Sequence, residues 1–319
     1  MHFRAVLNRD GGAMRTMDLA AFEATIRGTL EGEGHTTEIA VVSGQEISEA
    51  LAAASSDDRV DVVLVGGGDG TVSAAAAAVM NSDKALAILP AGTMNLFARG
   101  LGIPLQLEAA VKAFAHGVVC AVDIASASGK PFVHQFSIGM HADLIEKREA
   151  LAYGSRLGKI AASIRAAFET IWNPPRMRVR LDLDRAEIVA TTSNIGVSNN
   201  VFDEGHLPYA EMPNRGELGI YVTRARRRSD IFSFVLHLAI GRLRSNPQIE
   251  IHRSDRVTVT LLSTDKRFLC AVDGELHKLE RKTEIRCHPG ALKVLVPASA
   301  KLSSSEKRED GVVSQQVPG

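Results

Sequence analysis

The sequence is poor in several features that mark particular classes of protein. It contains only three cysteines, Cys120, Cys270 and Cys287, in apolar, strand-like surroundings. Their spacing suits neither a CxxC zinc site nor a disulfide framework. We therefore predict buried free thiols in a reducing compartment. The formal net charge is zero, so no global field attracts nucleic acid or an anionic membrane, and no nucleic-acid partner is expected.

Long hydrophobic runs are also lacking. The longest apolar helical segment, Ile231–Ile240, is shorter than the roughly 20 residues that span a bilayer. The opening MHFRAVLNRD lacks the apolar core and cleavage site of a signal peptide. We therefore expect a cytoplasmic protein, with peripheral contact at the inner face of the membrane and a homodimer both left open.

Hydrophobic residues make up 45% of the 319 residues and charged residues 23%, as in an ordinary soluble protein with room for about two domains. In the first third, the apolar runs FRAVLN, EIAVV, VDVVLV and ALAILP alternate with helical patterns. Phe22, Ile26 and Leu30, for example, recur on one helical face. This alternation predicts an α/β domain over residues 1–124, with a parallel sheet covered by helices on both faces.

The pattern changes after residue 124. Most segments up to residue 290 alternate with period two, and helices are predicted only near Leu157–Trp172 and Ile231–Leu243. We predict a β-rich sandwich over 125–290. Residues 291–302 contain a strand that could return to either domain, and the polar stretch 303–319 is predicted to be a disordered tail.

The stretch Leu64–Val72, LVGGGDGTV, predicts an anion site. A buried strand that ends in glycines and leads into a helix aims backbone N–H groups at a ligand. The pattern is neither a dinucleotide fingerprint nor a P-loop. Asp69 makes sense if a divalent cation joins it to bound phosphates. The alternative is a tight turn in which Asp69 or Thr71 caps the helix.

A second polar turn, PAGTMN, follows the next strand. In a parallel sheet it would lie at the same edge as the first turn, where ligands bind. The hydroxyl of Thr93 and the amide of Asn95 could hold a nucleotide, but a plain turn with an N-cap would also explain them.

Together, GGDGT and PAGTMNLFAR resemble the diacylglycerol kinase catalytic-domain family, which includes bacterial lipid kinases for diacylglycerol and sphingosine. AVDIA, QFSIGMHADL and AVDGEL match further family segments, and the resemblance runs from Asn8 to Glu275. LNRDGG matches less well, because Arg9 stands where the family has proline. GGDGT also occurs in NAD kinases, but their downstream Asn-Glu and Thr-Gly-Ser-Thr-Ala-Tyr-like segments are not found.

The resemblance implies an ATP-dependent lipid kinase that uses Mg²⁺, with a nucleotide-binding α/β domain, a β-rich lipid-substrate domain and a site in the cleft between them. It implies that Glu275 is the catalytic base, supported by Asp273, although VDGE could also be a simple hairpin turn. Asp69 would act through Mg²⁺, and Asp123 would be a second metal residue or only a turn cap. The residues implied to bind ATP are Asn8, Gly67, Gly68, Gly70, Thr71, Gly92, Thr93 and Asn95.

Two segments leave questions open. Asn214 and Arg215 occupy positions that are acidic in many relatives, so a secondary Mg²⁺ site is predicted to be lost. Residues 224–244 form an apolar helix with basic ends, which would either dock on a membrane or pack into the core. A nucleotide-binding protein without transfer activity, and a kinase of a soluble hydroxyl compound, are the alternative functions.

Overall fold

The structure is a computed structural model that describes residues 1–150, 172, 174–184, 186–225, 228–263, 268–300 and 302. Most of the helix predicted near Leu157–Trp172, and the whole predicted tail 303–319, lie outside these residues. The chain forms two compact units. The N-terminal unit comprises Met1–Val122, Glu211–Pro213 and Ala291–Gly319, and the C-terminal unit comprises Asp123–Ala210 and Asn214–Gly290.

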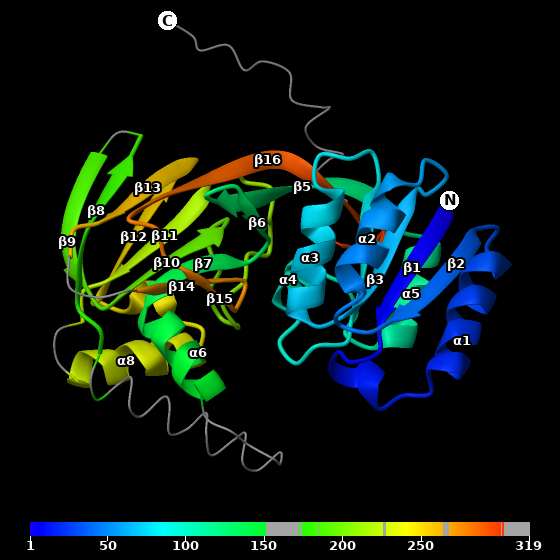
Figure 1. The fold of residues 1–319 in the computed structure, drawn as a ribbon, viewed down its shortest axis with the longest axis horizontal. Helices are drawn as coiled ribbons and strands as arrows, with labels where there is room; N and C mark the ends of the chain where they lie inside the picture. The colour runs from blue at the N-terminus through cyan, green and yellow to red at the C-terminus, as the bar shows by residue number, and fades with distance from the viewer. Residues whose placement is uncertain are drawn as a thin grey trace, which may run out of the picture. The chain divides into compact units, whose positions relative to one another are not determined.

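The N-terminal unit is built on a parallel sheet in the order β2-β1-β3-β4 (Figure 1). Its strands are β1 (His2–Asn8), β2 (Thr36–Val42), β3 (Val62–Gly67) and β4 (Ala85–Pro90). Val294, near the end of β16 (Lys282–Val296), pairs in parallel with Leu86 of β4. Every residue of β3 and β4 is buried. Helices on both faces therefore explain why these strands read as continuous apolar runs.

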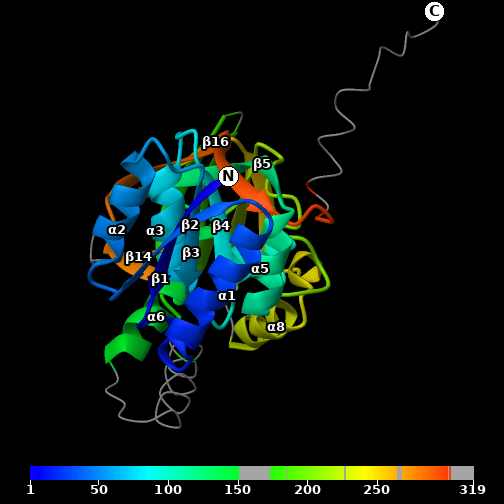
Figure 2. The same ribbon diagram turned by 90° about the vertical axis from the view of Figure 1, so that its right-hand side faces the viewer.

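Four helices cover this sheet. Helices α1 (Leu19–Gly32) and α5 (Leu107–Ala115) lie on one face, and α2 (Ile47–Ser56) and α3 (Asp69–Val79) on the other (Figure 2). Helix α1 begins where the Asp18 carboxylate accepts the N–H of Ala21 at 3.1 Å. Its buried residues are Phe22, Ile26 and Leu30, so the predicted apolar face is confirmed. A 3₁₀ helix (Gly12–Arg15) and the short α4 (Leu96–Gly100) lie in the loops after β1 and β4.

The C-terminal unit is a sandwich of two antiparallel sheets. The first contains the start of β16 together with β13 (Arg256–Leu261), β8 (Met177–Leu183) and β9 (Ala186–Thr192), and β5 (Val118–Ala127) and β6 (Lys130–Phe132) pair beside β16. The strands of the second, in order, are β12 (Ile249–Ser254), β11 (Leu218–Thr223), β10 (Asn194–Asn199), β7 (Gln135–Gly139), β14 (Leu269–Val272) and β15 (Glu275–Lys278).

Side chains from both sheets form one core, for example Phe136 and Ile220 from one and Val179 and Val257 from the other. An α/β unit followed by a β-sandwich confirms the predicted fold class. The helices α6 (Met140–Ala150) and α8 (Arg228–Ala239), and a 3₁₀ turn (Leu243–Ser245), complete this unit.

Some strands begin and end at positions that the period-two pattern of the sequence does not predict. EIVATTSNIGV divides at Ser193 into β9 and β10, which belong to different sheets. TEIRCH and ALKVLV, in contrast, lie in the single 15-residue strand β16. The three cysteines are buried and free, as predicted. Among the residues that the structure describes, no helix is both long enough and apolar enough to cross a membrane.

Candidate functional site

The loops after β1, β3 and β4 meet at one edge of the parallel sheet, where Asn8, Gly67 and Pro90 end these strands. The N–H of Ala13 donates to the Ala91 carbonyl at 2.8 Å. A Cβ atom on Gly92 would lie 2.9 Å from the Cα of Gly68, so the second and third loops are in direct contact. The structure thus brings the two motifs GGDGT and PAGTMN together in one place.

Asp69 joins these two loops. It is half-buried in the first turn of α3, and its carboxylate accepts the N–H of Asn95 at 3.2 Å and the N–H of Leu96 at 3.0 Å. The side chain therefore caps the start of α4. Each carboxylate oxygen has a further lone pair, so these contacts leave Asp69 able to face a cation. Its role in binding metal stays a prediction.

The two asparagines of the site shape its loops. Asn95 is buried with a left-handed backbone (φ 49°); its side chain accepts the N–H of Gly92 at 2.9 Å and donates to the Gly92 carbonyl at 2.8 Å. The Asn8 amide donates to Thr71 Oγ1 at 3.0 Å and accepts the N–H of Asp10 at 3.1 Å. Both asparagines are therefore part of the loop framework, while Thr93 is exposed at the tip of its loop.

The N-terminus of α3 fits an anionic phosphate group. Gly68 is its N-cap residue and, as a glycine, has no side chain that could cap the helix. The first N–H groups of a helix have no intrahelical acceptor, so they can donate to an anion. A Cβ atom on Gly68 would meet only the Cα of Gly92, at 3.8 Å, so the glycine opens space there. Gly67 differs, since its Cβ would lie 2.6 Å from Thr71 Oγ1, and packing alone explains it.

Asp273 and Gly274 form the two-residue turn between β14 and β15. Both have positive φ angles, 46° and 88°, as a type I′ hairpin turn requires. The Asp273 carboxylate also accepts the N–H groups of three consecutive residues, Val133, His134 and Gln135, each at 2.9 Å. The hairpin turn is therefore present, and its aspartate anchors the chain where it enters β7.

Glu275 follows this turn as the first residue of β15 and is exposed. Within the described residues, no hydrogen bond or ion pair holds its carboxylate. Glu275 thus sits next to a rigidly held turn with its acidic group available. Its catalytic role stays a prediction.

Asp123 lies at the start of the C-terminal unit and is only 2% exposed. Its carboxylate accepts the Asn200 side-chain amide at 3.0 Å and the N–H groups of Gly216 and Gly290 at 2.6 and 3.0 Å. These neutral donors make Asp123 a structural node. In the described ranges no three His, Cys, Asp or Glu side chains come together where they could hold a metal ion, and the metal role of Asp123 stays a prediction.

Arg215 lies in this same region. The Arg215 guanidinium is 3.0 Å from the Asp203 carboxylate, and the backbone N–H of Arg215 donates to the Asn200 side-chain oxygen at 2.8 Å. The arginine that replaces an expected acid is thus an ion-pair partner within the C-terminal unit. The loss of a secondary metal site stays a prediction.

Sequence reasoning missed a partly buried polar cluster beside the Asp273 turn. His141 Nδ1, in the first turn of α6, lies 2.6 Å from Ser137 Oγ and 3.3 Å from Gln135 Nε2. Burial and, to a smaller extent, Arg148 lower the pKa of His141, which favours the neutral imidazole as acceptor of both donors. The Ser-x-x-x-His spacing across a strand end was the available signal, but it is common and weak.

Two family models match the chain, and together they account for most of it. The diacylglycerol kinase catalytic domain matches residues 2–127, and the YegS C-terminal NAD kinase beta sandwich-like domain matches residues 138–296. The first match covers the α/β region and the second covers the β-sandwich region.

Two curated relatives are similar over part of their length. An uncharacterized protein of Synechocystis sp. is 27% identical over 267 residues, which are 79% of this chain and 59% of that protein. A probable lipid kinase YegS-like of Yersinia pestis is 34% identical over 111 residues, 34% of this chain and 38% of that protein. The matched part is thus less than two thirds of either relative.

Solved structures from Bacillus anthracis str. Sterne share the fold. A putative diacylglycerol kinase superposes with a TM-score of 0.73 at 20% identity, covering 94% of this chain and 96% of its own. A second structure, described as a diacylglycerol kinase, gives 0.70 at 18% identity, covering 94% and 98%. At this identity the likeness speaks for the fold alone. With both family models matching in order along the sequence, the chain belongs to the diacylglycerol kinase catalytic-domain family.

Proposed function

We propose that the protein is an ATP-dependent lipid kinase that transfers the γ-phosphate of ATP to a hydroxyl of diacylglycerol or a related lipid. The observation that carries the proposal is the meeting of the GGDGT and PAGTMN loops beside the uncapped N-terminus of α3. Family membership supports a kinase, and the name of the Yersinia pestis relative supports a lipid acceptor.

In this proposal the N-terminal unit binds ATP. The N–H groups of Gly68 and Gly70 donate to its phosphates, and Thr93 contacts the nucleotide from the exposed tip of its loop. Mg²⁺ held by Asp69 and the phosphates would neutralise the charge that develops during transfer. Asn8 and Asn95 act by fixing the loops, because their side chains already bond to Thr71 and Gly92.

The C-terminal unit supplies Glu275 as the general base. As the acceptor hydroxyl oxygen bonds to the γ-phosphorus, the bond between that phosphorus and the β–γ bridging oxygen breaks, and ADP leaves. The hydroxyl proton passes to the Glu275 carboxylate. Asp273 is a positioning residue here, because its bonds to Val133, His134 and Gln135 hold the turn that carries Glu275.

The test is a transfer assay with γ-labelled ATP over a panel of diacylglycerols, sphingosine and glycerol. We expect labelled lipid with the wild type and a strong loss of label with Asp69→Ala and with Glu275→Ala. ATP binding is measured separately by calorimetry. ATP binding without any transfer would indicate a nucleotide-binding protein that lacks transfer activity. Labelled glycerol without labelled lipid would indicate a kinase of soluble hydroxyl compounds. Undiminished transfer in both variants would refute the assignment of the site.

A further inference from the structure

Helix α8 is apolar on two sides. On one side, Ile231 is fully buried and packs with Met140 and Ala225, with Phe234 against them. On the other, Phe232 is 64% exposed and Leu236 is 48% exposed. Such a helix meets the core with one apolar stripe and presents a second one outward.

The exposed residues form a single stripe, since Phe232, Val235, Leu236 and Ile240 recur at intervals of three and four. A helix on the surface of a globular protein normally carries polar residues there. The 12 residues of α8 are too few to span a bilayer. An apolar stripe of this kind marks a surface that meets an apolar partner.

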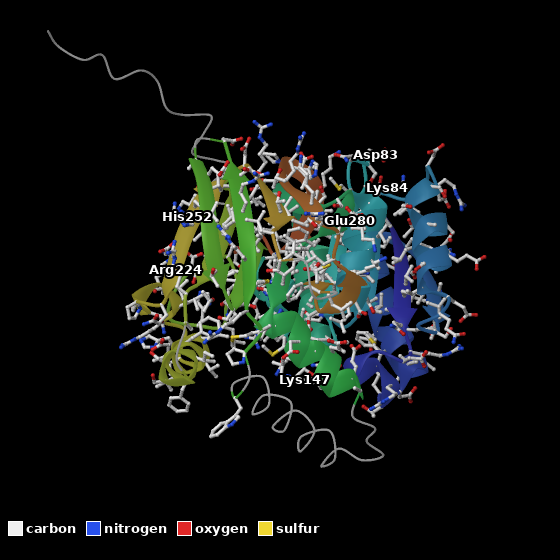
Figure 3. The ribbon with its side chains drawn as sticks, turned by 60° about the vertical axis from the view of Figure 1, so that its left-hand side comes forward. Asp83, Lys84, Lys147, Arg224, His252 and Glu280 are labelled. Carbon is white, nitrogen blue, oxygen red and sulfur yellow. The ribbon has the colours of Figure 1, made fainter. Side chains whose placement is uncertain are left out.

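The charge around the stripe identifies the partner. Residues 224–244 contain six arginines and a single carboxylate, Asp230, which makes a net charge of +5 in a chain whose formal net charge is zero. Arg224, which is labelled in Figure 3, is exposed and forms an ion pair with Glu250 at 2.7 Å, whereas Arg242 is exposed just after the helix. Arg226 and Arg227 lie outside the described residues. Apolar residues flanked by arginines are typical of helices that lie in the headgroup region of an anionic membrane.

We propose that the α8 surface, defined as Phe232, Val235, Leu236, Ile240 and Arg242, docks on the face of an anionic lipid bilayer. The four apolar side chains enter the acyl boundary, and the arginine contacts lipid phosphates. The inference deepens the proposed function and rests on it, because a lipid kinase must reach a substrate that resides in a bilayer. Membrane docking is nevertheless measured without ATP or transfer.

The test is sedimentation of the full chain with vesicles of equal parts phosphatidylglycerol and phosphatidylcholine, or of phosphatidylcholine alone. We expect binding to the anionic vesicles, weakening in high salt, and at least tenfold weaker binding for the double variant Phe232→Gln/Leu236→Gln. Val189→Gln is the matched control, since Val189 is an apolar residue of β9, outside α8, and is 47% exposed. Equal binding of the double variant and the control would overturn the proposal.

A second measurement reports the position of the α8 surface directly and does not rely on a variant that binds vesicles more weakly. The three cysteines are buried, so an environment-sensitive dye can be attached selectively to Phe232→Cys or, as control, to Val189→Cys. Anionic vesicles should shift the emission of the dye at position 232 to the blue and leave the dye at 189 unchanged. If the emission of the dye at 232 were already shifted to the blue without vesicles, protein would cover the stripe, and the proposal would be overturned. This conclusion would hold whether sedimentation showed a dimer or a monomer.

Failure of docking is separable from failure of the proposed function. Transfer to a short-chain diacylglycerol dissolved without vesicles tests the kinase alone. Transfer without vesicle binding would overturn only the α8 proposal, whereas vesicle binding without transfer would support docking and count against the kinase.

Discussion

Two Asp-Gly pairs of this protein have the same sequence and different structures. Asp69-Gly70 begins helix α3 in the N-terminal unit, whereas Asp273-Gly274 forms the hairpin turn between β14 and β15 in the C-terminal unit. The neighbouring residues decide between helix and turn, because an alanine-rich run follows the first pair, whereas the short strands LCAV and ELHK stand on either side of the second.

Both aspartates nevertheless do the same work. Asp69 accepts two N–H groups from the loop after the next strand, and Asp273 accepts three from Val133, His134 and Gln135, the last of which begins β7. Each of these motif aspartates, to which a role in metal binding or proton transfer would be assigned from chemistry alone, therefore also links two segments of the chain. Loss of activity on mutation of either aspartate would therefore not by itself prove a chemical role.

Glu275→Gln should have the largest effect and should separate chemistry from architecture. Transfer should fall by about 10²–10⁴-fold if the carboxylate is the general base. The free energy of unfolding should change by less than about 0.5 kcal/mol because the side chain is exposed. Kinetics measures the transfer rate, and urea titration measures the free energy of unfolding. The control is Glu187→Gln, because Glu187 is an exposed glutamate of β9. An equal effect of both substitutions on transfer would contradict the role.

Asp273→Ala should destabilise the C-terminal unit by about 2–4 kcal/mol, because three N–H donors lose a charged acceptor. Asp273→Asn keeps one oxygen acceptor and should lose less. The measurement is the free energy of unfolding from urea titration followed by circular dichroism. A loss below about 1 kcal/mol would mean that the hydrogen bonds to Val133, His134 and Gln135 contribute little.

Asp69→Ala should destabilise less, by about 1–2 kcal/mol, because two donors lose their acceptor and the site is half-buried. Calorimetry should also show weaker binding of ATP with Mg²⁺. Asp69→Asn should recover part of the stability but not the Mg²⁺-dependent affinity. If Asp69→Asn recovered both the stability and the Mg²⁺-dependent affinity, Asp69 would be a purely structural residue that acts only as a helix cap.

The smallest effect should be an acid sensitivity to which His141 contributes, together with His277 and His288, whose pKa values burial also lowers. Burial lowers the pKa of His141 in the folded protein below its ordinary value of 6.5. As the pH falls below 6.5, His141 of the unfolded chain therefore takes up a proton that the folded chain does not, and this residue alone lowers stability with a slope of at most about 1.4 kcal/mol per pH unit. Urea titrations between pH 7 and 5 measure this. His141→Gln should flatten the slope, and an unchanged slope would assign it elsewhere.

Much of the fold was readable from local pattern. Continuous apolar runs predicted the parallel strands β3 and β4, and helical spacing predicted the buried face of α1. The sequence prediction divides the chain at residues 124 and 290, and the structure divides it at 122 and 290, with the small exception of residues 211–213. The division of EIVATTSNIGV at Ser193 was not readable, because both halves alternate alike and only pairing partners tell the sheets apart.

The site was readable as a set of residues but not as a set of contacts. Glycines and polar residues after consecutive apolar strands already determined that the GGDGT and PAGTMN loops lie at one edge, because parallel strands end on the same side. Only the tertiary structure decided that Asn95 bonds within its own loop, that Asp69 caps α4, and that Asp123 binds three neutral donors. Hydrogen-bond partners distant in sequence depend on chain packing, which no local pattern encodes.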